Sequence, residues 1–144
     1  MVPNEHAITV DPANQIVIVL AKGFFSVEEG CKIVTTARTL AHKHKFNILY
    51  DARLVEMKLK LTDWFYLPRT LPVFKDAEAR KIKVGILASE TNKDMEFEFI
   101  ENVSNNLGFN LKLFYDRDQA LQWLTPEIAE SNLDTKNKQD KPEN

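Results

Sequence analysis

The apolar run from Ile16 to Leu20 constrains the fold of this chain more than any other stretch. A strand with one exposed face alternates apolar and polar residues, whereas a strand covered on both faces is apolar throughout. The run therefore predicts a strand inside a sheet, with helices following to cover it. The apolar stretch Ala7–Val10 precedes it across the turn-forming residues Asp11–Asn14, which predicts an opening hairpin.

The rest of the chain, up to Leu124, alternates helical and strand patterns. Ser26, with Glu29 three residues later, is a capping-box pattern that opens the first helix. The order predicts an α/β domain: a mixed, mainly parallel sheet of about five strands with helices packed against it. After the hairpin, helices are expected at 27–43, 63–72, 93–106 and 116–124, and strands at 46–50, 82–87 and 109–115.

Asp51 follows the apolar run 46–50, at the predicted junction of a strand with a loop. The next stretch, 52–61, alternates apolar and charged residues, and we expect an extended loop there, with a short edge strand as the alternative. Asp51 either caps the following turn or serves as a catalytic acid or cation ligand, since ligands gather beyond the carboxyl ends of strands. Because nothing in the sequence pairs with it, capping is favoured.

The length of 144 residues fits one domain. We place this domain at residues 1–126 and a flexible polar tail at 127–144, where charged and amide residues dominate. The N-terminus lacks a basic segment followed by an apolar run, and no stretch approaches about 18 uninterrupted apolar residues. A cytoplasmic protein without a transmembrane segment is therefore expected.

Charge and side-chain chemistry argue against several classes of function. The formal net charge of -2 supplies no broad basic field, so nucleic acid is not an expected partner. His42 and His44 are two residues apart on a predicted helix and point to different faces, so no metal site is expected. The lone Cys31 has no predicted acid-base partner, and an inert buried thiol is favoured. We expect no catalytic residue and no cofactor, which makes an enzyme the least supported class.

From about Ile8 to Leu124, the order of elements and several motifs resemble the SpoIIAA-like, STAS-related family. The most telling motif is a strand that ends in an aromatic residue and Asp, followed by Ala-Leu-x-Trp-Leu. The segments that carry the resemblance are the hairpin, the turn at Gly23-Phe24, Ile48-Leu49-Tyr50-Asp51-Ala52-Arg53, Val84-Gly85-Ile86-Leu87, Leu113-Phe114-Tyr115-Asp116 and Ala120-Leu121-Gln122-Trp123-Leu124.

The resemblance implies a compact SpoIIAA-like βα superhelix. This fold is shared by STAS regulatory modules, which bind protein partners, and by lipid-carrying domains of the CRAL-TRIO type. In the anti-sigma-factor antagonists, a partner kinase phosphorylates a serine that opens the second helix. The corresponding stretch here, Leu61-Thr62-Asp63-Trp64, has no serine and no following glycine. Thr62 is a possible phospho-acceptor, but a helix N-cap is the favoured role.

The second predicted helix carries more aromatic residues than one helix face can bury. Successive helical residues are about 100° apart, so the consecutive residues 64–67 cover nearly the whole circumference. The segment either folds back at Pro68 and Pro72 so that all of it is buried, or forms a dimer or partner surface, or closes over an apolar pocket. The candidate partner or ligand surface comprises Asp51, Thr62, Asp63, Trp64, Phe65, Tyr66, Leu71 and Phe74.

These patterns favour a non-enzymatic, STAS-like interaction or regulatory module without a standard phospho-serine switch. Its expected partner is another protein or a second copy of the chain, as a homodimer. The alternative is a binding module for a lipid or another small apolar ligand, in which Trp64, Phe65 and Leu71 line the pocket.

Overall fold

The computed structural model describes residues 3–57, 71–75, 77–90 and 97–125. These residues form a sheet whose strands lie in chain order. Strand β1 is antiparallel to β2, and all other neighbouring strands are parallel, which confirms the predicted mixed, mainly parallel sheet. The strands are β1 (Glu5–Asp11), β2 (Ile16–Phe25), β3 (Asn47–Met57), β4 (Lys83–Leu87) and β5 (Asn110–Phe114).

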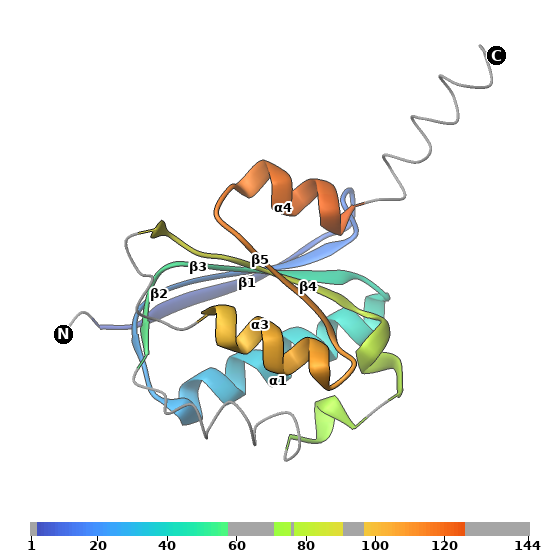
Figure 1. The fold of residues 1–144 in the computed structure, drawn as a ribbon, viewed down its shortest axis with the longest axis horizontal. Coiled ribbons are helices and arrows are strands. Elements are labelled where there is room, and N and C mark those ends of the chain that lie inside the picture. The colour runs from blue at the N-terminus through green and yellow to red at the C-terminus, as the bar shows by residue number, and fades with distance from the viewer. Residues whose placement is uncertain (1–2, 58–70, 76, 91–96, 126–144) are drawn as a thin grey trace, which may run out of the picture.

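Helices cover both faces of this sheet. Figure 1 shows α1 and α3 on one face and α4 on the other, which confirms the predicted α/β class. The helices are α1 (Val27–His44), α3 (Phe97–Asn106) and α4 (Arg117–Leu124), and two 3₁₀ helices, η1 (Pro72–Phe74) and η2 (Ala77–Lys81), precede β4.

Helix α1 begins where the capping-box pattern predicts. The Ser26 hydroxyl accepts from the Glu29 backbone N–H at 3.1 Å, and the Glu29 carboxylate accepts from the Ser26 N–H at 2.9 Å. The two bonds satisfy donors that a helix N-terminus otherwise leaves unpaired. At the other end, Lys45 adopts a left-handed conformation with φ 59°, which ends the helix before β3.

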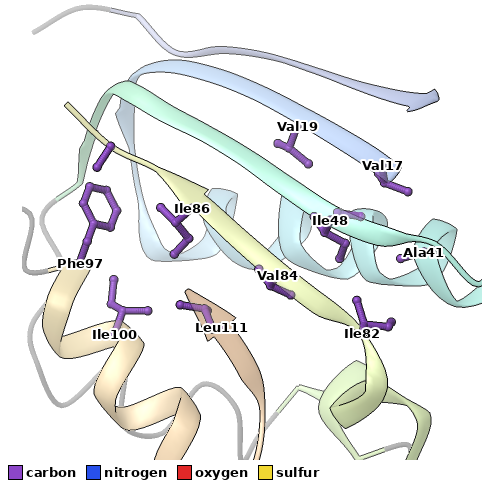
Figure 2. Packing of buried hydrophobic residues seen from close by; sticks show 12 residues of the cluster. Val17, Val19, Ala41, Ile48, Ile82, Val84, Ile86, Phe97, Ile100 and Leu111 are labelled. Atoms are coloured by element: carbon purple, nitrogen blue, oxygen red, sulfur yellow. The ribbon is translucent and has the colours of Figure 1, made fainter. Parts of the chain in front are cut away.

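The core has one layer on each face of the sheet, and the β2 run supplies both. Val17 and Val19 point towards α1 and α3, where they join Ile48, Phe97 and other residues (Figure 2). Ile16 points the other way and packs beneath α4. Ile16 and Val17 are both fully buried, so the predicted coverage of this run on both faces is confirmed at its start. Leu20, at its end, is 55% exposed.

Strands β2 and β3 are longer than the sequence predicts. The expected turn at Gly23-Phe24 and the expected loop after Asp51 are both wrong, since β2 continues to Phe25 and β3 to Met57. The alternative of a strand after Asp51 is the one observed, as far as Met57. The extensions pair with each other after a register shift between Leu20 and Lys22. Gly23 adopts φ +94°, and a Cβ there would overlap the backbone of Pro3. The glycine therefore lets the N-terminal segment pass close to the strand and does not end it.

Candidate functional site

A cavity of about 150 Å³ lies between the sheet and the helices α1 and α3. Residues of β2 to β5, both of these helices and η1 line it, and nearly all are apolar. The part of α1 above the cavity carries Gly30, Cys31 and Val34, none of which has a side chain larger than that of valine. Protein interiors are normally close-packed, and an apolar cavity of about this volume can hold a molecule the size of benzene.

Arg38 projects into this apolar region from α1. It is 5% exposed, and its Nη1 donates to the backbone oxygen of Ala79 at 3.3 Å. The guanidinium carbon lies 4.5 Å from the centre of the Phe74 ring and 5.6 Å from that of Phe109, so two aromatic faces partly stabilise the charge. Among the residues that the structure describes, its Nε has no hydrogen-bond partner.

Burial lowers the pKa of Arg38, because the charged form loses its hydration in an apolar site. An arginine nevertheless keeps its proton at neutral pH. Among the described residues, no carboxylate forms an ion pair with Arg38. The cavity wall therefore carries a positive charge without a counter-ion from this part of the chain.

Tyr50, at the centre of β3, lines the same cavity. The residue as a whole is half-buried, but its hydroxyl oxygen is shielded from solvent and has no hydrogen-bond partner in the described part of the chain. Burial raises the pKa of Tyr50 to about 12, and the charge of Arg38 opposes this shift. The hydroxyl is therefore protonated at neutral pH and retains a proton that it can donate.

Asp51 also lines the cavity, but its charge is compensated. Arg53 binds both carboxylate oxygens, with Nε to Oδ1 at 2.9 Å and Nη2 to Oδ2 at 2.7 Å. The hydrogen bond to this carboxylate raises the pKa of Arg53. Asp51 lies within β3, so the expected turn after it is absent, but its Oδ1 does accept a hydrogen bond from the backbone N–H of Arg53 at 3.3 Å. Its oxygens orient a neighbouring side chain of the same strand.

The structure brings together three residues of the predicted surface: Asp51, Leu71 and Phe74 line one cavity. Thr62, Asp63, Trp64, Phe65 and Tyr66 lie outside the described residues.

Sequence reasoning missed Arg38 and Tyr50. The signal for Arg38 was its spacing: Cys31, Val34 and Arg38 follow one another at three- and four-residue steps, so a charged side chain stands on the apolar face of the helix. The signal for Tyr50 was a hydroxyl inside a buried strand pattern.

Cys31, on the cavity wall, is half-buried. Burial raises the pKa of its thiol, and the nearby Glu28 carboxylate acts in the same direction. The protonated thiol is a poor nucleophile at neutral pH.

Within the described ranges, no group of at least three His, Cys, Asp or Glu side chains could hold a metal ion. None of the described helices is both long enough and apolar enough to cross a bilayer.

One solved structure similar to this chain is that of an uncharacterised protein from Shewanella loihica PV-4, a member of the DUF3478 family with a SpoIIAA-like fold. The two share 18% sequence identity and superpose with a TM-score of 0.53, over 86% of this chain and 95% of the other. No protein-family model and no curated protein sequence matches this chain. The likeness shows the fold alone, and the SpoIIAA-like fold predicted from the sequence is confirmed.

Proposed function

We propose that this protein binds a small, mainly apolar molecule in the cavity between the sheet and helices α1 and α3. The observation that carries the proposal is the cavity itself: about 150 Å³ of partly open space between the sheet and two helices, with apolar walls and a few polar side chains. Small-molecule sites commonly combine these features. The volume suits a group near the size of a single aromatic ring.

Filling the cavity tests this proposal. Val34 lines the cavity from α1, and a Val34→Phe variant places a ring in the space that a ligand needs. Val103, half-buried on α3 but not on the cavity wall, supplies the matched control Val103→Phe. With benzene as the probe, amide chemical-shift changes should appear in the wild type and in Val103→Phe and be absent in Val34→Phe. Absence of binding in the wild type would overturn the proposal.

Cys31 offers an independent readout because it is the only cysteine of the chain and lines the cavity. A bound molecule would cover its thiol and slow alkylation by iodoacetamide. Saturating benzene should therefore reduce the alkylation rate in the wild type and leave it unchanged in Val34→Phe. An unchanged rate in a wild type already shown to bind benzene would place the binding elsewhere.

The self-associating regulatory module stays a prediction. Its aromatic residues 64–66 lie outside the described residues. Within the described ranges, the most exposed large apolar side chain is that of Leu54, on the extension of β3 that follows Asp51. An exposed leucine in this stretch is compatible with a contact between two copies, for which solution mass is the test.

A further inference from the structure

We propose that the molecule bound in the cavity is a small carboxylic acid with an apolar, ring-sized body, and that Arg38 and Tyr50 receive its carboxylate. This inference rests on the proposed function and names the chemical class of the ligand. It starts from two side chains that line one cavity from two different elements, Arg38 and Tyr50, each of which has a buried polar atom without a partner among the described residues.

The charges on the cavity wall determine which sign of charge a ligand should carry. Arg38 and Asp51 are the charged side chains of the lining within the described residues. Asp51 is paired through both oxygens with Arg53, whereas Arg38 has aromatic rings and one backbone oxygen as neighbours. A buried charge without a counter-ion is costly, and an incoming anion removes that cost. A cation would be repelled by Arg38.

The number of donors and the space available select a carboxylate. One guanidinium supplies a single positive charge and planar N–H groups that match carboxylate oxygens, and the Tyr50 hydroxyl supplies one more donor. A phosphate monoester carries nearly two charges at neutral pH, which this single cation would not balance. The rest of the wall is apolar and suits a hydrocarbon body of about one ring.

An uncharged molecule of the same shape fits the cavity less well. It leaves the Arg38 charge without a counter-ion and gives the Nε at most a neutral acceptor. Hydrogen bonds with an ionised partner are roughly twice as strong as neutral ones. The carboxylate should therefore bind about tenfold more tightly than a neutral isostere.

Benzoate and benzamide provide this comparison, since they differ mainly in charge. Titration calorimetry on the full chain at neutral pH should give benzoate about tenfold higher affinity. Arg38→Met should remove this preference and keep weak binding of benzamide. The matched control is Arg80→Met, because Arg80 also lies over Phe109, at 4.8 Å, but is exposed and does not line the cavity. It should keep the preference.

Tyr50→Phe removes only the hydroxyl and should lower benzoate affinity severalfold, whereas Tyr115→Phe, at an exposed tyrosine, should not.

The outcomes separate this inference from the function on which it rests. Equal affinity of the wild type for both probes, or an equal loss in Arg38→Met and Arg80→Met, would overturn the inference and leave a binding cavity of another specificity. Binding of neither probe, nor of benzene, would overturn the proposed function and the inference together. The wild-type comparison decides even if Arg38→Met does not fold.

Discussion

The two faces of the sheet are built differently. Beneath α4, packing is tight and polar groups are paired: a Cβ on Gly85 would lie 3.2 Å from Leu124 Cδ1, and the Asn47 side chain bonds both Leu124 O and Lys83 N at 2.9 Å. Beneath α1 and α3 there is a cavity, and Arg38 and Tyr50 each have a buried polar atom without a partner within the described ranges. The face beneath α4 is tightly packed, which favours stability. The face beneath α1 and α3 has unfilled space and these two polar atoms, and a bound ligand could fill the space and supply hydrogen-bond partners.

The largest expected effect on stability tests the tightly packed face beneath α4. Leu124 is 1% exposed, and Leu124→Ala should lower the free energy of unfolding by about 3 kcal/mol, because a close-packed site cannot collapse around the lost methyl groups. Val34→Ala, beside the cavity, should cost less than about 1.5 kcal/mol, since fewer contacts are lost. Urea denaturation measures both values. Equal losses would mean that the two faces are equally well packed.

The next effect concerns the buried hydroxyl of Tyr50, on the face of the sheet that α1 and α3 cover. The pKa of Tyr50 is raised from 10.0 to about 12, so the folded state holds this proton more tightly than the unfolded state. The resulting stability is fully present below pH 10 and is lost as the pH rises to about 12. The loss should reach about 2 to 3 kcal/mol in the wild type.

Denaturation at several alkaline pH values measures this loss, and Tyr50→Phe should lack that part of the pH dependence. Tyr115→Phe, which removes an exposed hydroxyl, should behave like the wild type. Identical alkaline profiles for the wild type and Tyr50→Phe would show that this hydroxyl is hydrated in solution.

A smaller effect is expected from removing the buried charge. Arg38→Met loses the bond to Ala79 and the aromatic contacts, but it also removes a desolvated cation. Replacing buried ionic groups by apolar ones of similar size is often neutral or stabilising, so the free energy of unfolding should change by less than about 1 kcal/mol. Thermal and urea unfolding check this. A loss as large as that of Leu124→Ala would make Arg38 a structural residue and remove the contrast between the faces.

The smallest effect on stability is expected at the exposed Leu54, which is 69% exposed. Leu54→Lys should change the free energy of unfolding by less than about 0.5 kcal/mol. If the predicted homodimer uses the stretch from Asp51 to Phe74, this variant should shift the mass in light scattering from twice the chain mass towards 16.6 kDa. A wild type that is monomeric at all concentrations would contradict the predicted self-association.

Much of the fold was predictable because it depends on local patterns. The unbroken run in β2 indicates coverage on both faces, and Ser26 with Glu29 marks the start of α1. The lengths of β2 and β3 were not predictable in this way. Gly23 reads as a break in a single sequence, but its φ of +94° and the nearby Pro3 backbone let the strand continue.

The candidate site, like the fold, was predictable from the sequence only in part. Sequence alone determined the fold class, the start of the first helix and a stretch that includes Asp51, Leu71 and Phe74, because periodicity, capping and composition act over a few neighbouring residues. Only the tertiary structure decided that these residues share a cavity with Arg38 and Tyr50. Arg38 meets Ala79 across 41 positions, and whether a buried donor finds a partner depends on such distant segments.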